Sequence, residues 1–374
     1  MAGIYIHIPF CKQACNYCNF HFATSLHHKE EMIKAIAAEV RLAATDGFIQ
    51  PELIETIYFG GGTPSLLDTA EIEAILQAIH LEHGVAENAE ITLEANPDDL
   101  NGDKLKAWKA AGVNRLSIGV QSFFEKDLVW MHRAHNAVQA REGIQLALQY
   151  FDNITIDLIY GVPGLTDERW QQNVETALAF GVPHLSCYAL TVEPKTPLDK
   201  MIRRHEKKDV DGGKQSEQFL LLMHWLQQAG YEHYEISNFA KPGFRSRHNS
   251  AYWKGVPYFG LGPSAHSFNG NARRWNIANN QKYIQAIVAG QLPFEEELLT
   301  PVQQTNEMIM IALRTTDGID TTRFAEDEKR RVLKQADKYL KNGWLLQTEF
   351  FLRLTNEGKL YADGIAADLF LEDK

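Results

Sequence analysis

Six short apolar runs recur along the chain as far as Ala229, and each is followed by a segment whose apolar residues repeat at helical spacing. Short apolar runs are typical of buried strands, whereas apolar residues three and four positions apart are typical of helices that cover a sheet. The pattern predicts strands at Ile4–Ile8, Thr56–Phe59, Glu90–Glu94, Arg115–Val120, Ile154–Ile159 and Leu185–Leu190. It predicts helices at Glu30–Ala44, Thr69–His80, Gly102–Ala111, Ala137–Tyr150, Asp167–Phe180 and Gln215–Ala229.

The alternation of strand and helix predicts an α/β fold with a parallel sheet and right-handed connections. Six such units suit a partial (β/α)6 barrel that is open along one side, although a doubly wound open sheet has the same pattern. In either architecture, functional groups gather at the carboxyl ends of the strands. Residues that follow the predicted strands are therefore the first candidates for a site.

The pattern changes near residue 291, where helices at Val302–Arg314, Thr321–Phe324 and Glu328–Asn342 lead into short strand-like runs and a last helix from Asn356. This order predicts a small winged-helix-like C-terminal domain. Winged helices often bind DNA, but this segment holds more acidic than basic residues, so we expect no nucleic-acid partner. The predicted domains are a barrel core at 1–230, an aromatic and glycine-rich connecting region at 231–290, and the C-terminal domain at 291–374.

Composition limits the possible partners and the cellular location of the protein. With 45% hydrophobic residues the chain can bury a large core, and its net charge of −11 argues against broad binding to nucleic acid or anionic lipid. No apolar run approaches the roughly 18 residues of a membrane span, which leaves only peripheral contact with a membrane. Four cysteines and no signal peptide predict a reducing, cytoplasmic location.

Three of the four cysteines, Cys11, Cys15 and Cys18, lie within eight residues, directly after the first predicted strand and Pro9. Proline ends regular structure, so the cysteines should lie on a loop that can turn three thiolates towards one place. Such thiolates select zinc or an iron–sulfur cluster. Zinc would need a fourth ligand to close a structural site, whereas a [4Fe–4S] cluster on three cysteines keeps one iron open. We favour the cluster over zinc, a disulfide or buried thiols, and interpret Cys187 as core.

The motif Tyr5-x-His7-x-Pro9-Phe10, followed by the three cysteines, resembles the radical S-adenosylmethionine (SAM) superfamily. More narrowly, it resembles the branch that contains oxygen-independent coproporphyrinogen III oxidases (HemN) and HemW haem chaperones. The resemblance implies that the open iron binds the amino and carboxylate groups of SAM, and that the reduced cluster cleaves SAM. Its ordered motifs extend from Tyr5 to about the C-terminus.

Polar or glycine residues follow the other predicted strands. Gly60-Gly61-Gly62-Thr63-Pro64 could bring backbone N–H groups close to a ligand, but is equally typical of a tight turn. Glu94 could simply begin a turn, Arg133 could pair with a carboxylate or lie in solvent, and Asp157 would be costly to bury without a partner. The resemblance implies that SAM is bound by Tyr5, Tyr17, Gly61, Gly62, Thr63, Glu94, Gln121, Arg133 and Asp157.

A second candidate site lies in the aromatic and glycine-rich stretch that contains His248 and Tyr252. These residues are four apart, so one helical turn would place them on the same face. His248 could be an ordinary hydrogen-bonding residue, yet neutral imidazole is also a common haem ligand. The stretch matches the H-N-x-x-Y motif of HemW proteins, and this resemblance implies that His248 and Tyr252 bind haem. Arg245 and Arg247 could pair with the propionates.

The resemblance leaves two main functions. In the first, the chain carries a [4Fe–4S] cluster and SAM, binds haem and transfers it to an acceptor protein of unknown identity. In the second, it is an oxygen-independent coproporphyrinogen III oxidase of porphyrin biosynthesis. The oxidase motif has a further cysteine where this chain has Phe20, and an N-terminal extension that is missing before Tyr5. Both departures favour the chaperone. A radical enzyme for another substrate is the third alternative, so whether the chain is an enzyme stays open.

Overall fold

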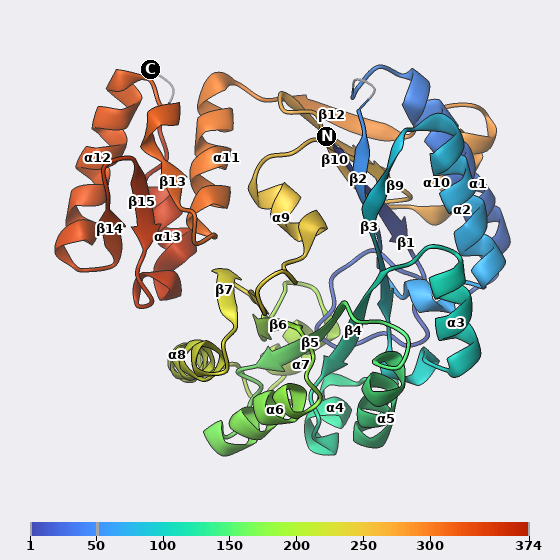
Figure 1. The fold of residues 1–374 in the computed structure, drawn as a ribbon, viewed down its shortest axis with the longest axis horizontal. Coiled ribbons are helices and arrows are strands. Elements are labelled where there is room, and N and C mark those ends of the chain that lie inside the picture. Colours follow the sequence, from blue (N-terminus) through green and yellow to red (C-terminus); the bar gives the residue numbers. More distant parts are fainter. Residues whose placement is uncertain (1, 50–51, 373–374) are drawn as a thin grey trace.

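The computed structural model describes residues 2–49 and 52–372 of the 374-residue chain as a curved sheet with helices on its outer face (Figure 1). Six parallel strands form the centre of the sheet, in the order in which they occur in the chain. They are β1 Ala2–Ile8, β2 Ile54–Gly61, β3 Val85–Ala95, β4 Arg115–Gln121, β5 Ile154–Tyr160 and β6 His184–Ala189. All six predicted strands are therefore confirmed.

Short strands that the sequence pattern did not predict extend both edges of this sheet. Beside β1 lies the parallel β9 Tyr258–Leu261, followed by the antiparallel β10 His266–Phe268, β11 Ala272–Asn276 and β12 Phe294–Leu298. Beside β6 lie the antiparallel strands β8 Asn238–Ala240 and β7 Glu232–Glu235. The twelve strands run from β12 to β7, and these two end strands do not pair with each other. The sheet is a partial barrel with one open side, as predicted.

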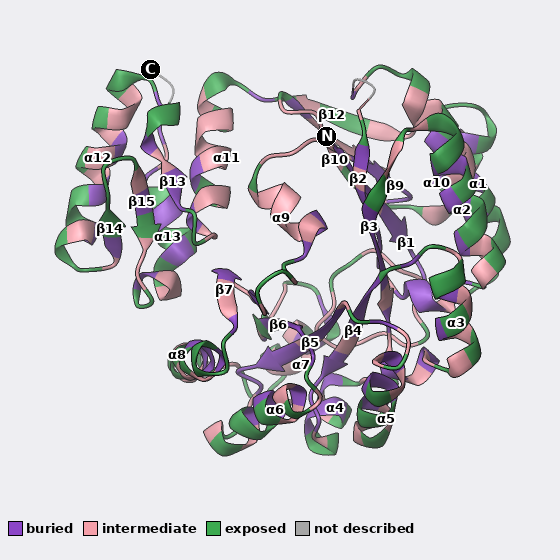
Figure 2. Cartoon of the chain, in the orientation of Figure 1, coloured by how far each residue is buried: buried purple, intermediate pink, exposed green. Residues whose placement is uncertain are grey.

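The predicted helices of the barrel cover the convex face of the sheet, where buried residues face the strands and exposed residues face solvent (Figure 2). They are α1 Lys29–Thr45, α2 Thr69–Glu82, α3 Gly102–Ala110, α5 Ala137–Ala147, α6 Asp167–Ala179 and α8 Gly212–Gln228. The pattern missed α4 Glu125–Met131, α7 Pro197–Arg203 and α10 Asn280–Val288. The helix α9 Arg247–Trp253 lies on the concave side instead (Figure 1).

The C-terminal elements form a small separate layer beside the open side of the barrel (Figure 1). Residues such as Ile309, Leu313, Val332 and Leu352 form a hydrophobic core of their own. The elements are α11 Pro301–Leu313, α12 Glu326–Lys341, α13 Ala362–Asp368 and a three-stranded antiparallel sheet of β13 Ile319–Asp320, β15 Phe351–Leu354 and β14 Leu345–Gln347. This architecture confirms the predicted fold class, while the three domain boundaries stay predictions. Within the described part of the chain, no helix is long and apolar enough to cross a membrane.

Glu39 of α1 joins the first helix to the unpredicted strands. Its side chain is buried and accepts hydrogen bonds from the Tyr283 hydroxyl, from Asn276 Nδ2 at 2.6 Å and from the Gly262 N–H at 2.7 Å. These donors lie on α10, on β11 and just after β9. Burial nevertheless dominates and raises the pKa of Glu39 to about 7. The carboxyl therefore binds a proton more tightly in the folded chain than in the unfolded one.

This raised pKa predicts a pH-dependent contribution to stability. Because only the unfolded state loses this proton between about pH 4.5 and 7, the contribution of Glu39 falls as pH rises through that window. We expect Glu39→Gln to reduce the free energy of unfolding by about 2 to 3 kcal/mol more at pH 5 than at pH 8. Urea denaturation of the metal-free protein measures both values. Glu73→Gln, on the exposed face of α2, is the control, and an equal effect of Glu39→Gln at both pH values would contradict the prediction.

Candidate functional site

A cavity of about 460 Å³ opens at the carboxyl ends of the parallel strands, and we call it the cysteine cavity. It is lined by most of the residues that the sequence singled out. These are Cys11, Cys15, Cys18, Tyr17, Gly61, Gly62, Thr63, Glu94, Gln121, Arg133 and Asp157. They come from β2, β3, β4 and β5, from the loop after β1 and from the segment after α4, so the fold brings together residues that are far apart in the sequence.

The cysteine loop is held at its base by backbone hydrogen bonds. The Cys11 N–H donates to the Ala23 carbonyl at 3.0 Å, and the Ala23 N–H donates to the Pro9 carbonyl at 2.9 Å. Farther along the loop, the Asn16 N–H donates to the Met131 carbonyl at 3.3 Å, at the end of α4. The loop therefore spans from the end of β1 to the end of α4, and its three thiols face the space between them.

The environment of the thiols fits a bound cationic group. The three cysteines form no disulfide and are half-buried. Burial raises the pKa of Cys11 to about 11 and also raises that of Cys18, so a nearby positive charge is needed to hold either as a thiolate. No three His, Cys, Asp or Glu side chains among the described residues could hold a single metal ion. An iron–sulfur cluster uses a separate iron for each cysteine, so it does not require three side chains around one ion.

The glycine-rich turn after β2 lies directly against the end of β1. The Gly62 N–H donates to the Ile8 carbonyl at 2.9 Å, and the Thr63 N–H donates to the Phe10 carbonyl at 2.7 Å. A Cβ atom on Gly62 would collide with the Phe10 carbonyl, and Gly61 has a φ of +101°. The glycines are thus explained by close packing of two backbones. The N–H groups of Gly62 and Thr63, which the sequence suggested for a ligand, are already used by β1.

Arg133 links the cysteine loop to the ends of β3 and β4. Its Nη1 donates to Cys15 Sγ at 3.2 Å, while Nη2 donates to Asn96 Oδ1 at 2.7 Å and to the Gly119 carbonyl at 2.9 Å. Its Nε is buried and has no hydrogen-bond partner among the described residues. A buried donor without a partner is costly, so this atom is suited to an acceptor supplied by a ligand.

Two carboxyl groups face the same cavity and form no ion pair within the described part of the chain. Glu94 accepts a hydrogen bond from the Tyr58 hydroxyl at 2.8 Å, and burial raises its pKa to about 7. Burial likewise raises the pKa of Asp157 to about 6, although a hydrogen bond from Ser186 and the positive charges of Arg115 and Arg133 oppose the shift. A positively charged ligand would favour the ionised form of both groups and lower both pKa values. The cavity is therefore suited to a ligand with cationic and hydroxyl groups.

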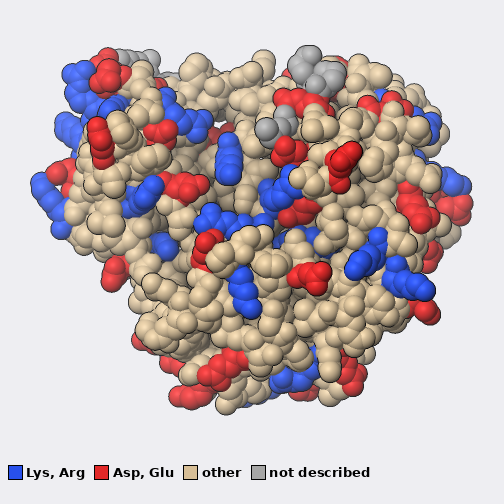
Figure 3. Space-filling model, viewed as in Figure 1, with Lys and Arg blue, Asp and Glu red and all other residues tan. Residues whose placement is uncertain are grey.

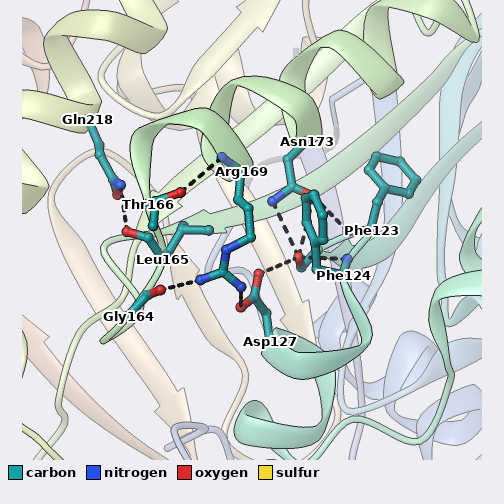
Figure 4. A network of polar contacts seen from close by, with 10 residues as sticks. Phe123, Phe124, Asp127, Gly164, Leu165, Thr166, Arg169, Asn173 and Gln218 are labelled. Atoms are coloured by element: carbon teal, nitrogen blue, oxygen red, sulfur yellow. Dashed lines mark hydrogen bonds and ion pairs between the residues drawn. The ribbon is translucent and has the colours of Figure 1, made fainter.

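The end of β4 has a strained backbone, because Gln121 adopts a left-handed conformation with φ of 65°. A buried network of polar contacts fixes the residues that follow (Figure 4). Asn173 of α6 accepts a hydrogen bond from the Phe123 N–H at 2.7 Å, and the Ser122 hydroxyl donates to Asp127 at 2.9 Å. Since these groups hold both sides of the turn, the network keeps Gln121 at the cavity.

The same network reaches the loop after β5 (Figure 4). Arg169 of α6 donates to Asp127 Oδ1 at 3.1 Å and also bonds the Gly164 carbonyl. Gln218 of α8 donates to the Leu165 carbonyl at 3.2 Å. Helices on the outer face thus position the turns that follow β4 and β5.

Several cavity residues were not predicted from the sequence. Asn96 directly follows β3, and Ser117 lies within β4. Tyr188 of β6 also lines the cysteine cavity and is 42% exposed. The sequence signal that could have identified these residues is a polar or aromatic residue near the end of a predicted strand. The other unpredicted lining residues include Gln13, Asn19, Phe20, Phe22, Thr191 and Glu193.

Three predicted site residues, Tyr5, His248 and Tyr252, do not line the cysteine cavity. Tyr5 stacks on Tyr58, with ring centroids 6.2 Å apart, behind the glycine turn. His248 and Tyr252 lie on the same face of α9, which confirms the predicted helical turn. Tyr58 also stacks on His248 at 5.1 Å, so it lies between Tyr5 and α9.

His248 is only 1% exposed, and both of its ring nitrogens have partners. Nδ1 lies 2.8 Å from Thr56 Oγ1, and Nε2 lies 2.8 Å from the Tyr252 hydroxyl. Burial, with a smaller contribution from Arg115, lowers the pKa of His248 to about 3, so the imidazole is neutral. Glu90 of β3 accepts hydrogen bonds from the N–H groups of Arg247 at 3.0 Å and His248 at 2.9 Å. The imidazole thus holds α9 inside the barrel, and direct ligation of iron would require breaking one of its hydrogen bonds.

Comparison with known protein families gives two matches. Residues 5–177 match the Radical SAM superfamily, and residues 299–361 match the HemN C-terminal domain. Among solved structures, the fold is similar to that of coproporphyrinogen III oxidase (HemN) from Escherichia coli, described as a radical SAM enzyme. The TM-score is 0.84 with 23% identity, over 99% of this chain and 90% of that chain.

Curated relatives are similar over nearly the whole chain. The heme chaperone HemW of Bacillus subtilis is 34% identical, over 98% of each chain. The heme chaperone HemW of Mycobacterium tuberculosis is 33% identical, over 98% of this chain and 94% of that protein. The mouse mitochondrial protein named radical S-adenosyl methionine domain-containing protein 1 is 31% identical, over 98% of this chain and 87% of that protein.

Proposed function

Because the chain belongs to the HemW family within the radical SAM superfamily, we propose that it is a haem chaperone that carries a [4Fe–4S] cluster and SAM. In this function it binds haem and passes it to an acceptor protein. The observation that carries the proposal is the similarity to heme chaperones over almost the full length of the chain. The cysteine cavity supports it, because that cavity offers donors for both the cluster and SAM.

Cys11, Cys15 and Cys18 would hold the cluster as thiolates. When bound, the cluster supplies an electron to SAM and an open iron for its methionyl group. Arg133 already donates to Cys15 Sγ and would stabilise the thiolate form of that side chain. The Phe10 and Ala23 backbone pairing fixes the start of the loop, so the thiols are positioned before a cluster binds.

The remaining cavity residues would each bind a different part of SAM. Arg133 Nε, which has no hydrogen-bond partner among the described residues, would donate to the methionyl carboxylate, while Glu94 would accept from the amino group. Asp157 and Gln121 would bind the ribose hydroxyls, and Tyr17 would contact the adenine. Gly61, Gly62 and Thr63 would shape the wall against which the methionyl end lies. Tyr5 would act indirectly, by supporting Tyr58 and thereby Glu94.

For haem, we propose that α9 contributes through the residues it carries. His248 and Tyr252 would hold this helix in place by their mutual hydrogen bond, and Arg245 and Arg247 lie at its start. The oxidase is the second candidate function, favoured by the fold shared with HemN. Against it stands Phe20, which occupies the place of the oxidase's additional cysteine; its side chain is 64% exposed and lines the cysteine cavity.

The cluster proposal predicts the effect of removing its ligands. We expect anaerobic reconstitution of the wild type to give a [4Fe–4S] absorbance with about four irons and four sulfides per chain. Replacing Cys11, Cys15 and Cys18 by alanine should abolish it. Cys187→Ala is the matched control, because Cys187 is buried in β6 away from the cavity and its loss should leave the cluster intact. One stoichiometric zinc without sulfide would show that the cluster assignment is wrong.

The SAM proposal predicts a change in the electron paramagnetic resonance (EPR) signal of the reduced cluster when SAM binds. Arg133→Ala removes the donors to the carboxylate and should raise the SAM concentration needed for this change by about tenfold or more. Arg133→Lys, which keeps the charge, should need a SAM concentration between those of the wild type and Arg133→Ala. Lys126→Ala changes an exposed residue of α4 and should match the wild type. An unchanged spectrum at saturating SAM would count against direct binding to the cluster.

The chaperone and oxidase functions are separated by one experiment. The reconstituted protein is incubated anaerobically with coproporphyrinogen III, SAM and a reductant, and the products are resolved by mass spectrometry. We expect no decarboxylated product. In parallel, haem titration should give a saturable Soret band, and an added haem-free globin should withdraw the haem. Decarboxylation of the porphyrinogen would overturn the chaperone proposal, as would the absence of haem binding.

A further inference from the structure

A second cavity of about 570 Å³ lies at the amino ends of the strands, and we call it the α9 cleft. Ala2 and Thr56 line it from the starts of β1 and β2, and Arg247 and Trp253 line it from α9. Its size lies within the roughly 300–1,000 Å³ that is usual for small-molecule sites. Thr56 and Gly61 are five residues apart on β2, so the cleft and the cysteine cavity are separated by roughly 17 Å along that strand.

The C-terminal elements supply the opposite wall of the α9 cleft, with Met308 from α11 and Phe351 from β15. They are tied to the barrel by backbone bonds: the Ile236 N–H donates to the Arg314 carbonyl at 2.9 Å, and the Thr316 N–H donates to the Tyr234 carbonyl at 3.1 Å. The cleft therefore lies between the barrel and the C-terminal elements, which come last in the chain.

Charged side chains of both signs line the cleft, since Asp317 and Asp320 lie there beside the basic residues. Arg245 is paired with Glu232 at 2.9 Å, and Arg247 with Glu55 at 3.5 Å. Lys254 and Arg323 also line the cleft, and neither has an ion pair in the described ranges 2–49 and 52–372. Lys and Arg side chains lie among Asp and Glu side chains at the centre of the face drawn in Figure 3. Each wall therefore offers one cation to an anionic group of a ligand, Lys254 after α9 and Arg323 on the C-terminal side next to Asp320.

Between these cations the cleft offers aromatic surface and one unsatisfied donor. Trp253 closes α9, and its Nε1 is buried without a hydrogen-bond partner in the described part of the chain. The Arg314 guanidinium lies over the indole at 5.3 Å and fixes its position. Phe351 faces the same space from the C-terminal layer. A flat, largely apolar ligand with carboxylates at its edge matches this lining.

We propose that the α9 cleft is the haem-binding site of this chain. The proposal rests on the haem-chaperone function proposed above and gives that function a location. Lys254 and Arg323 bind the two propionates, and the macrocycle lies between Trp253 and Phe351. His248 lies one layer behind the wall, bonded to Thr56, and acts as a positioning residue for α9.

The side chains that line the cleft limit the choice of an iron ligand. Of the described residues that line it, only Met308 and Tyr234 belong to the classes that bind haem iron. The Tyr234 hydroxyl already lies 2.8 Å from His184 Nε2 and accepts from the Ser246 N–H at 3.3 Å. The Met308 thioether has no hydrogen-bond partner among the described residues, although the side chain packs against the C-terminal core. We therefore assign Met308 as the ligand that can reach iron without breaking an existing hydrogen bond.

The test is a haem titration of the reconstituted full-length protein, followed by its Soret band. The double variant Lys254→Glu/Arg323→Glu should weaken haem binding by about tenfold or more, because both propionate partners are reversed in charge. The double variant Lys126→Glu/Lys208→Glu makes the same change in net charge at exposed residues away from the cleft, and should bind as the wild type does. Equal affinity of the cleft variant and the wild type would overturn the proposal.

Two further measurements address position and ligation. Saturating SAM should leave haem affinity unchanged, since the two ligands occupy opposite ends of the strands; displacement of haem by SAM would place haem in the cysteine cavity and overturn the proposal. Met308→Leu should shift the Soret maximum. His248→Ala should leave the Soret maximum at the wild-type wavelength, even if α9 is loosened. The opposite pattern would reject Met308 as the ligand. A wild type that binds no haem at all would instead show that the chaperone function itself is wrong.

Discussion

The close approach of β1 and β2 at their carboxyl ends is the constraint on which the rest of the cysteine cavity depends. The backbone of Gly62 packs so tightly against Phe10 that no side chain can lie between them. The resulting hydrogen bonds from Gly62 and Thr63 to the end of β1 fix the point at which the cysteine loop leaves the sheet. Arg133 can bond Cys15 only because this exit point directs the loop across the strand ends towards α4. A shift between β1 and β2 would displace the thiols relative to Glu94 and Asp157 together.

The parallel sheet also explains how two cavities can exist without sharing residues. Carboxyl ends of parallel strands meet at one edge and amino ends at the other, so each edge gathers its own set of loops. Tyr58 lies between the two edges: its hydroxyl bonds Glu94, and its ring stacks on His248. One aromatic side chain therefore packs the interior of the barrel between the two edges and supports both Glu94 and α9.

The sequence predicts the central strands, the covering helices and the composition of the cysteine cavity well, because each rests on a local signal. Apolar runs mark β1 to β6, and polar residues directly after them mark the cavity. It does not predict β9 to β12, whose short segments have polar and glycine residues and are stabilised by contacts such as those of Glu39, more than 200 residues away. The packing that requires glycine at position 62 could not be predicted either, since only the structure shows which atoms a Cβ would meet. For the same reason, His248 could be recognised as notable, but not as a buried residue with both nitrogens occupied.

The two walls of the α9 cleft belong to different parts of the molecule, so a ligand could leave when these parts separate. Lys254 follows α9 on the barrel, whereas Arg323 belongs to the C-terminal layer, so a dianion held by both would join the two. The direct backbone ties between these parts are few and involve the edge strand β7 and its neighbours. A strand at the edge of a sheet is restrained from one side only, and its contacts open at lower cost than those of β1 to β6. Separation of the two walls would remove one propionate partner while leaving the other in place. Because each lost charge-assisted contact weakens binding by about an order of magnitude, a small opening of the cleft would be enough to turn retention of the ligand into release.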